Sequence, residues 1–360
     1  MKQAEVWAGR IAVTNGRSLT VDVAKGVGIL LIALGHNWLV LGDRGALFQV
    51  IYSFHVPLFF VLSGVFLRQS TPFTRVIRSR VDALLKPYFV VLTTWGAMVF
   101  LGKWMVAGTE GYGPLAYFGG VLYGTGATIV WAPLWFLPHL FLSAICAWTI
   151  IRCSGGVVLR SASMSAFLLL VGIATIGSLG PHDIALLDIV DSKASIGWPW
   201  SLDLVPITAP FIVAGYLMRD WILQGRFRLP VFVLALAVFI ALHMVLHQTM
   251  QLNERDYGQP VMSTLQAGLG IYLCIAISQV LGRLSLTSSV LAFIGARSLL
   301  VLIFHSCIQD WIFLGLADQI ANPYVRAVLG LVCGIAIPLL LWEGARRNSL
   351  LKAALLPRHA

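Results

Sequence analysis

The stretch DVAKGVGILLIALGHNWLV, Asp22 to Val40, decides the class of fold to which this chain belongs. It is long and apolar enough to cross a membrane as a helix, which needs about 20 predominantly apolar residues. Yet it carries Asp22 and Lys25 at one end and His36 deep inside. Ionisable groups in hydrocarbon are costly unless they are paired or hydrated, so the stretch indicates a membrane helix with a functional face.

The composition of the whole chain supports this interpretation. Hydrophobic residues make up 58% of its 360 residues and charged residues only 11%, against roughly 25% charged residues in soluble domains. A soluble protein of this composition would have too little polar surface to cover its core. We therefore predict an all-α integral membrane protein. The net charge of +10 is expected to report loop orientation, not binding to nucleic acid.

About ten segments are long enough to form a bundle of transmembrane helices. Their expected limits are 22–41, 48–67, 84–102, 132–151, 162–180, 199–218, 230–247, 261–281, 289–314 and 325–342. The aromatic, glycine-rich run 112–130 is ambiguous and is compatible with a re-entrant or interfacial piece. We expect a cytoplasmic segment over 1–21, one multi-pass membrane domain over 22–342 and a basic cytoplasmic tail over 343–360.

The distribution of Lys and Arg predicts the orientation of these helices. If the N-terminus is cytoplasmic, 18 Lys and Arg residues fall in inner segments and 5 in outer segments. Basic residues are enriched in cytoplasmic loops, so both termini are expected to lie inside.

No metal site and no tightly bound cofactor are predicted. The five cysteines lie in or beside apolar segments without CxxC spacing, which favours small core residues over metal ligands or disulfides. His243 and His247 stand one helical turn apart, but the glutamate of an HExxH motif and a third ligand are missing.

Helical geometry places the polar residues of the opening stretch on one face. Lys25 and His36 are eleven residues apart, which is about 20° past three full turns and about 16 Å along the axis. Asp22 lies three residues before Lys25 and can pair with it. We expect this face to line the bundle interior or a wet cavity. The alternative is that Lys25 reaches the inner interface and that His36 only hydrogen-bonds a neighbouring helix.

The second predicted span carries another histidine, in Tyr52-Ser-Phe-His55-Val-Pro57-Leu-Phe-Phe-Val-Leu-Ser63-Gly64. The chain would enter this span from outside, so His55 is expected near the outer end, where it and His36 could line one cavity. A structural role for His55 at the interface is the alternative. Ser63 and Gly64 are small enough for close contact between helices.

The connection after that span, RQSTPFTRVIRSRVDALLK from Arg68 to Lys86, is strongly basic. Arg75 and Arg78 are three residues apart and would share one face of a helical turn. Two guanidinium groups so placed suit phosphate oxygens, because each planar fork donates two hydrogen bonds. The alternatives are a topology signal or contact with anionic lipid.

In this order, these features resemble the integral-membrane acyltransferase-3 family, over about residues 20 to 310. The opening stretch looks most like the fucose 4-O-acetylase-like branch of that family, although the family often has Arg where this chain has Lys25. The motifs are Lys25 with His36, the run Phe54–Gly64, Arg75 with Arg78, Pro133-Leu-Trp135-Phe136-Leu137 and Ser298-Leu-Leu-Val-Leu-Ile-Phe-His305-Ser306.

The resemblance implies transfer of an acyl group, usually acetyl from cytoplasmic acetyl-CoA, to a hydroxyl of a sugar, surface polysaccharide or glycolipid precursor. His36 is expected to act as general base or to carry the acyl group itself, with His55 as a second catalytic residue. Donors to an oxyanion are sought among His55, Ser63 and Asn37. The expected donor-binding residues are Lys25, Arg75, Arg78 and Arg80, and the candidate cavity-lining residues are Asp22, Asn37, Ser63, Trp135, His305 and Ser306.

The expected partners are acyl-CoA, a carbohydrate or glycolipid acceptor and membrane lipid, in a bacterial-type cytoplasmic membrane. The alternative function is a solute or proton-coupled transporter, because many spans with buried charges also suit a carrier. The sequence does not determine the acceptor, the acyl group or the oligomeric state.

Overall fold

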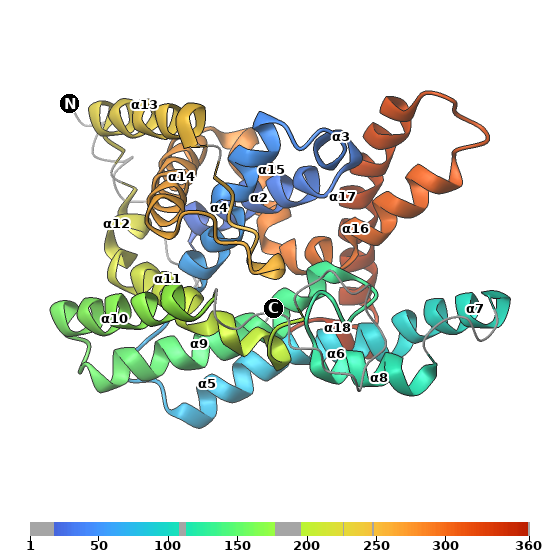
Figure 1. The fold of residues 1–360 in the computed structure, drawn as a ribbon, viewed down its shortest axis with the longest axis horizontal. Helices are drawn as coiled ribbons and strands as arrows, with labels where there is room; N and C mark the ends of the chain where they lie inside the picture. Colours follow the sequence, from blue (N-terminus) through green and yellow to red (C-terminus); the bar gives the residue numbers. More distant parts are fainter. Residues whose placement is uncertain (1–17, 108–112, 177–195, 226, 247, 359–360) are drawn as a thin grey trace. The chain divides into compact units, whose positions relative to one another are not determined.

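The computed structural model describes residues 18–107, 113–176, 196–225, 227–246 and 248–358, which fold as helices joined by short connections (Figure 1). Within these ranges the extended pairing is an isolated antiparallel bridge between Gln251 and Asp256. The chain forms two compact units. Unit 1 comprises residues 1–66, 214–250 and 257–339, and unit 2 comprises residues 67–213, 251–256 and 340–360.

Unit 1 is built around helix α2 (Leu19–Gly35), which packs most extensively against α15 (Ser285–Ala296). Two glycines permit this close approach. A Cβ atom on Gly26 would collide with the carbonyl oxygen of Leu291, and one on Gly295 with that of Asp22. Small residues let membrane helices approach in this way. The other helices are α3 (Trp38–Leu41), α4 (Ala46–Gly64), α12 (Arg219–Gln224), α13 (Leu229–Leu246), α14 (Pro260–Leu281), α16 (Ser298–Gly315) and α17 (Pro323–Arg347), whose last residues belong to unit 2.

Unit 2 contains an irregular helical run that begins at Phe73. It comprises α5 (Phe73–Arg80), a π-helical turn (Val81–Leu85), α6 (Lys86–Val91), a second π-helical turn (Leu92–Gly96) and α7 (Ala97–Ala107). Pro87 accounts for the first wide turn, because in a regular helix it could not donate to the carbonyl of Ala83 and its ring would clash there. The other elements are α8 (Pro114–Tyr123), a 3-10 turn (Ala132–Trp135), α9 (Phe136–Cys153), α10 (Val158–Ile176), a 3-10 segment (Pro199–Leu204), a 3-10 turn (Leu252–Glu254), α18 (Ser349–Leu355) and α11 (Val205–Leu217), whose last residues belong to unit 1.

Nine helical segments of the described residues are long and apolar enough to cross a membrane. Each overlaps one of the ten predicted spans. The predicted span 22–41 is not among the nine, because its helix ends at Gly35 after 17 residues. The span predicted over 289–314 is divided at Arg297 into α15 and α16. The helix expected over 84–102 starts earlier, at Phe73, so the basic segment before it is helical and not a loop.

The ambiguous run 112–130 contains α8, a helix of 10 residues that ends at Gly124 in the left-handed conformation (φ 67°). A helix of that length spans about 15 Å, which is too short to cross the hydrocarbon core. The predicted segment 1–21 lies mostly outside the described residues. The predicted tail 343–360 contains the end of α17 and the whole of α18.

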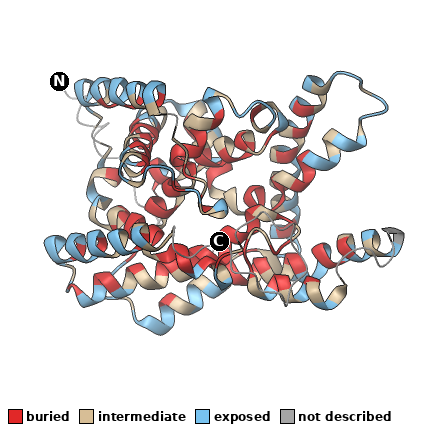
Figure 2. Cartoon of the chain, in the orientation of Figure 1, coloured by how far each residue is buried: buried red, intermediate tan, exposed pale blue. Residues whose placement is uncertain are grey.

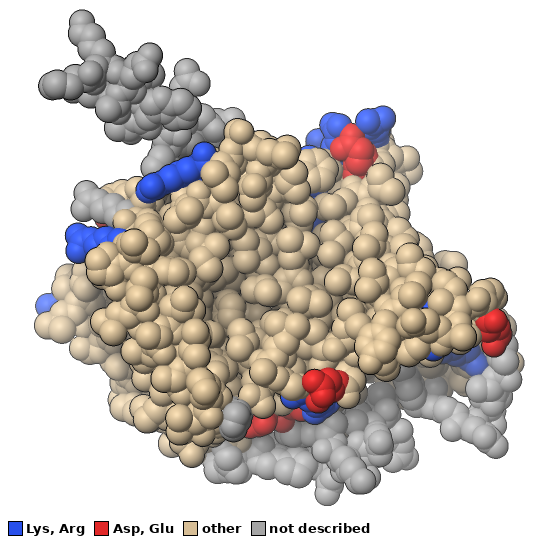
Figure 3. All heavy atoms as spheres, turned by 90° about the horizontal axis from the view of Figure 1, so that it is seen from above, with Lys and Arg blue, Asp and Glu red and all other residues tan. Residues whose placement is uncertain are grey.

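Large apolar side chains are exposed along α10, α13 and α17. Helix α13 has few buried residues, and Figure 2 shows it pale blue along most of its length. On the face shown in Figure 3, charged side chains lie near the margins and uncharged residues form the wide area between them. Apolar surface of this extent is typical of contact with lipid or with another protein, and it agrees with a multi-pass membrane protein.

Candidate active site

Helix α2 is shorter than the span 22–41 predicted from the sequence. Helix α2 stops at Gly35, and the backbone of His36 (φ −88°, ψ 4°) leaves the helical conformation. Asn37 then precedes the short helix α3, and its Oδ1 accepts a hydrogen bond from the backbone N–H of Leu39 at 3.0 Å. Asparagine suits this position because it satisfies a helical N–H group. The prediction of one continuous helix through Lys25 and His36 was therefore wrong, and His36 lies at a break.

A buried pair of amide side chains ties this break to neighbouring helices. Nδ2 of Asn37 donates to Oε1 of Gln309 on α16 at 2.6 Å and to the carbonyl oxygen of Ala327 on α17 at 2.9 Å. Nε2 of Gln309 donates to the carbonyl oxygen of Ala33 at 2.9 Å. Both amide hydrogens of Asn37 are thus engaged, so this side chain has no N–H group left to offer an oxyanion.

Three histidines of unit 1 gather beside the break. The ring centres of His36 and His305 are 5.3 Å apart, and the ring of Tyr52 lies 6.1 Å from that of His36 and 4.7 Å from that of His55. His55 and His305 are buried, whereas His36 is half-buried. His55 lies in the middle of α4, not near its outer end as predicted. Although three imidazoles meet here, no group of three or more His, Cys, Asp or Glu within the described ranges is arranged to hold a metal ion.

Backbone hydrogen bonds fix the tautomer of two of these rings. Nδ1 of His55 lies 2.8 Å from the carbonyl oxygen of Ile51, and Nδ1 of His305 lies 2.8 Å from that of Val301. A carbonyl oxygen can only accept, so Nδ1 carries the hydrogen and Nε2 of the neutral ring keeps its lone pair. Nε2 of His305 is buried without a hydrogen-bond partner in the described part of the chain. It is therefore available as an acceptor beside His36.

The remaining predicted residues of unit 1 lie on α2, α4 and α16. Asp22 and Lys25 are half-buried, one turn apart, in the first half of α2. Ser63 is half-buried near the end of α4, and Ser306 is half-buried next to His305 on α16. All four are thus partly accessible side chains on helices that carry a histidine of the cluster or end beside one.

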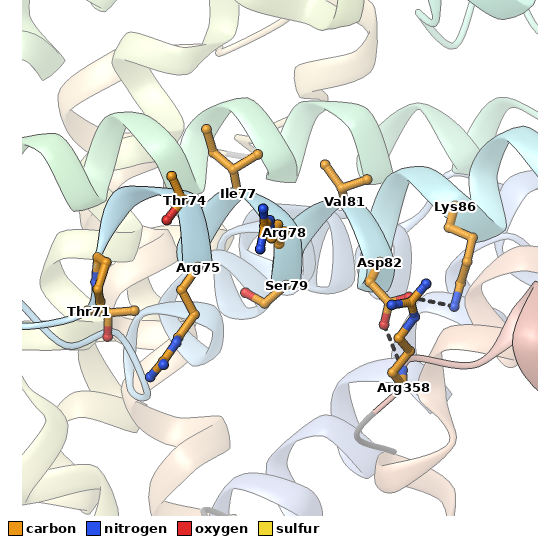
Figure 4. A pocket seen from close by; sticks show the side chains of 11 residues that line it. Thr71, Thr74, Arg75, Ile77, Arg78, Ser79, Val81, Asp82, Lys86 and Arg358 are labelled. Carbon is orange, nitrogen blue, oxygen red and sulfur yellow. Dashed lines mark hydrogen bonds and ion pairs between the residues drawn. The ribbon is translucent and has the colours of Figure 1, made fainter.

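A basic groove of about 1150 Å³ runs along α5 in unit 2 (Figure 4). Arg75 and Arg78, three residues apart on α5, both line it. Lys86 lines the same groove further along the helical run. Arg80 was predicted to contribute as well, but it is half-buried and does not line the groove.

Trp135 belongs to unit 2, where it is buried and stacks on His139, with ring centres 5.2 Å apart. Nε2 of His139 lies 3.0 Å from Oγ1 of Thr208, and Oγ of Ser143 lies 2.7 Å from the same Thr208 oxygen. Buried hydrogen bonds of this kind join membrane helices. Here they connect α9 with α11, and the indole of Trp135 packs over them.

Sequence reasoning missed Tyr52, Gln309, Asp82 and Arg358. Tyr52 and Gln309 each lie one helical turn from a histidine that had been singled out, so spacing alone could have indicated them. Asp82 and Arg358 line one groove although they are 276 positions apart. No local pattern connects residues at such a separation.

The fold, the histidine cluster of unit 1 and the basic groove of unit 2 define a class of protein. It is a multi-pass membrane protein in which one unit holds a cluster of three imidazoles and the other a groove lined by basic side chains. The chain belongs to the acyltransferase-3 family, whose sequence model, described as an acyltransferase domain, matches residues 19–343. It is a membrane acyltransferase, and the family assignment does not favour the transporter alternative.

Two curated relatives are nodulation proteins NolL. The protein from Sinorhizobium fredii (strain NBRC 101917 / NGR234) is 32% identical over 99 residues, which cover 25% of this chain and 26% of the relative. The protein from Mesorhizobium japonicum (strain LMG 29417 / CECT 9101 / MAFF 303099) is 35% identical over 103 residues, which cover 24% and 27%. The chain thus spans about a quarter of the length of these relatives. No solved structure matches it.

Proposed function

We propose that this protein transfers an acetyl group from cytoplasmic acetyl-CoA to a hydroxyl of a sugar in a surface polysaccharide or glycolipid precursor. Membership of the acyltransferase-3 family supports acyl transfer. The likeness of the stretch Asp22–His36 to the fucose 4-O-acetylase-like branch supports a sugar acceptor. The proposed location is a bacterial-type cytoplasmic membrane, where a cytoplasmic donor and an exported glycan precursor are both within reach.

The observation that carries this proposal is the half-buried His36 at the end of α2, beside buried His305. A sugar hydroxyl is a weak nucleophile at neutral pH, and a neutral imidazole can take its proton as the oxygen attacks the thioester carbonyl. The C–O bond forms, the C–S bond breaks, and CoA leaves as a thiolate that receives the proton from the imidazolium. The alternative route first forms an acyl-imidazole on His36, which the hydroxyl then attacks.

His305 is proposed as an orienting partner of the base. Its Nε2 is buried near His36 without a hydrogen-bond partner among the described residues, so it can accept the hydrogen of one His36 ring nitrogen once the substrates are bound, and the other nitrogen then acts as the base. His55 is proposed as the second catalytic residue. Because its Nδ1–H is engaged by the backbone, neutral His55 can accept a proton but cannot donate a hydrogen bond to an oxyanion. Ser63 remains as the candidate oxyanion donor among those predicted.

The phosphates of the donor are proposed to bind in the basic groove of unit 2. Arg75 and Arg78 are exposed and line it together. Each guanidinium can donate paired, charge-assisted hydrogen bonds to phosphate oxygens. Lys25 is proposed as a further cation for the donor in unit 1. CoA is multiply charged and crosses lipid poorly, so cationic side chains suit its binding.

Transfer of a labelled acetyl group tests the proposed function. Purified full-length protein in detergent is expected to release CoA from labelled acetyl-CoA and to pass the label to a glycan acceptor. In cells, deletion of the gene is expected to lower the mass of one surface polysaccharide or glycolipid by one acetyl group. Unchanged glycan masses together with no turnover of acetyl-CoA would reject the proposal, and solute uptake into liposomes without acyl-CoA would favour a transporter.

Replacing Gln309 by alanine is expected to slow acyl transfer about tenfold, which corresponds to roughly 1.4 kcal/mol of lost transition-state stabilisation. The substitution removes the hydrogen bonds to Asn37 and Ala33 that hold the chain on both sides of His36. Because Gln309 positions the base and does not bind the donor, kcat should fall while KM for acetyl-CoA stays nearly unchanged. Steady-state kinetics at varied acetyl-CoA concentration separates the two parameters.

The matched control is Gln266→Ala on α14. Gln266 is also a fully buried glutamine of unit 1, but neither of its amide atoms has a hydrogen-bond partner among the described residues. Its loss should leave kcat within about twofold. An equal fall in kcat for both variants, or a rise in KM alone for Gln309→Ala, would contradict the positioning role.

A further inference from the structure

One end of the basic groove is formed by the C-terminal part of the chain. Nζ of Lys86 donates to Oδ1 of Asp82 at 2.8 Å and to the carbonyl oxygen of Leu356 at 2.6 Å. The backbone N–H of Arg358 donates to Oδ2 of Asp82 at 2.6 Å, and its Nε lies 3.8 Å from Oδ1. Figure 4 shows Lys86 and Arg358 next to Asp82, each joined to its carboxylate by a dashed line. The C-terminal segment therefore supplies part of the wall of this groove.

The backbone of the C-terminal segment is held in place, but its last described side chain, that of Arg358, is exposed and only weakly paired. Leu356 is buried, and α18 packs against α6, so the backbone is held in place. The Arg358 side chain, in contrast, is 86% exposed, and its 3.8 Å approach to Asp82 is longer than a good hydrogen bond. An exposed ion pair of this kind contributes little free energy. The guanidinium can therefore rotate to another anion at small cost while the backbone of Arg358 stays bound.

The charge of the groove favours an anion. Its lining includes four basic side chains and one acidic side chain, Asp82. The basic residues lie in two groups along the helical run, Arg75 and Arg78 near its start and Lys86 with Arg358 about Asp82. Arg75 and Asp82 are seven residues apart, which corresponds to about 10 Å along a helix. A ligand with two separate phosphate groups would match this arrangement.

The size of the groove also suits such a ligand. Its volume is about 1150 Å³, above the roughly 300–1,000 Å³ of pockets that hold drug-sized molecules. Acyl-CoA carries a diphosphate and, across the ribose ring, a separate 3′-phosphate. It therefore has the two anionic groups that the two basic groups can bind.

We propose that Arg358 is a third phosphate-binding arginine of the donor site, held near Asp82 until the donor binds and then transferred to one of its phosphates. This inference rests on the proposed function, since it takes acyl-CoA as the donor. Arg75 and Arg78 bind one phosphate group and Arg358 binds the other. Asp82 competes with the donor for Arg358 and keeps the C-terminal segment in place through its bond to the backbone.

Equilibrium binding of CoA to the detergent-solubilised full-length protein tests the proposal. Arg358→Ala is expected to weaken CoA binding about fivefold to tenfold, as expected for loss of one charge-assisted hydrogen bond at an accessible site. Asp82→Asn should strengthen it about twofold to threefold, because the competing charge is removed while an acceptor for the Arg358 N–H remains. Arg75→Ala with Arg78→Ala should weaken it more than Arg358→Ala alone. Repeating the titrations with 3′-dephospho-CoA shows which phosphate Arg358 binds, since the effect of Arg358→Ala disappears only if its partner is the 3′-phosphate.

The matched control is Arg347→Ala. Arg347 is also an exposed arginine of unit 2, paired with Glu343, but it does not line the groove. Its variant should bind CoA like the wild type.

Wild-type affinity in Arg358→Ala, with weakened binding in the Arg75 and Arg78 double variant, would overturn the role of Arg358 and leave the proposed function standing. Weakened binding to vesicles of anionic lipid, with CoA affinity unchanged, would assign Arg358 to lipid instead. If the wild type neither binds CoA nor turns over acetyl-CoA, both proposals fail.

Discussion

Replacing His36 by alanine is expected to lower the rate of acyl transfer by about 10²- to 10⁴-fold, the usual contribution of a positioned general base. The loss should appear in kcat, while KM for acetyl-CoA changes little, because the imidazole acts on the reacting hydroxyl and not on the donor phosphates. The residue is half-buried at the end of α2, with the ring of buried His305 5.3 Å away. Initial rates of CoA release by the purified variant measure both parameters.

His243→Ala is the matched control for this prediction. His243 is another buried histidine of unit 1, and its Nδ1 lies 2.8 Å from the carbonyl oxygen of Phe239, the same local bond that His55 makes. The control should keep nearly full activity. Full glycan acetylation in cells that express His36→Ala at a normal level would contradict the catalytic role. Label retained on acid-quenched wild-type protein, but not on His36→Ala, would favour the acyl-imidazole route over direct transfer.

Replacing Asp203 by alanine is expected to destabilise the protein by about 3–5 kcal/mol, the usual effect of removing one partner of a buried ion pair. Asp203 and Arg255 form such a pair in unit 2, with 3% and 4% of their side chains exposed and Oδ2 of Asp203 3.0 Å from Nε of Arg255. Oδ1 of Asp203 also accepts the backbone N–H of Trp198 at 2.9 Å. The alanine would leave a buried guanidinium without its counter-ion, so the melting temperature in detergent should fall.

The same ion pair holds a strained segment of backbone. Trp200 and Ser201 both have left-handed conformations (φ 55° and 53°), each of which costs about 1–3 kcal/mol in a residue other than glycine. Nη2 of Arg255 donates to Oγ of Ser201 at 3.2 Å, and a Cβ atom on Gly197 would collide with the same guanidinium. Loss of Asp203 should therefore free the left-handed turn at Trp200 and Ser201, and it also leaves Arg255 without this counter-ion.

Glu343→Ala provides the control for the stability measurement. Glu343 pairs with Arg346 and Arg347 on an exposed face of α17, and exposed ion pairs contribute about 0–1 kcal/mol. Its melting temperature should stay close to that of the wild type. A similar fall in melting temperature for Glu343→Ala and Asp203→Ala would contradict the larger contribution to stability expected of the buried Asp203–Arg255 pair.

Most of the helices could be predicted from the sequence. The predicted span 261–281 differs from α14 by one residue at one end, and 132–151 is close to the helical run that ends at Cys153. Apolar length is a reliable signal because, in a bilayer, each backbone N–H and C=O group must be bonded within its own helix. The breaks were not predicted. His36 and Arg297 leave the helical conformation inside apolar runs that composition alone would continue.

The candidate site shows the same division. His36, His55 and His305 could be singled out because an imidazole in an apolar span is costly unless it has a function or a partner. Arg75 and Arg78 could be paired because helical spacing is local. Their contacts with other helices could not be predicted: spacing along α4 places Tyr52 near His55, but it does not show that Tyr52 also approaches His36 or that Arg80 lies outside the groove.

The sequence by itself therefore determined the membrane class, most of the helices and the polar side chains that stand within apolar spans, where they are costly unless they have a partner or a function. The tertiary structure alone decided which of those side chains meet. Asn37 bonds Gln309 across 272 positions, and Asp203 pairs with Arg255 across 52. The physical reason is distance along the chain. Hydrophobic length and helical spacing are properties of one helix, and the sequence of that helix shows them. These pairs depend on how separate helices pack, which is determined by the shapes of side chains throughout the unit.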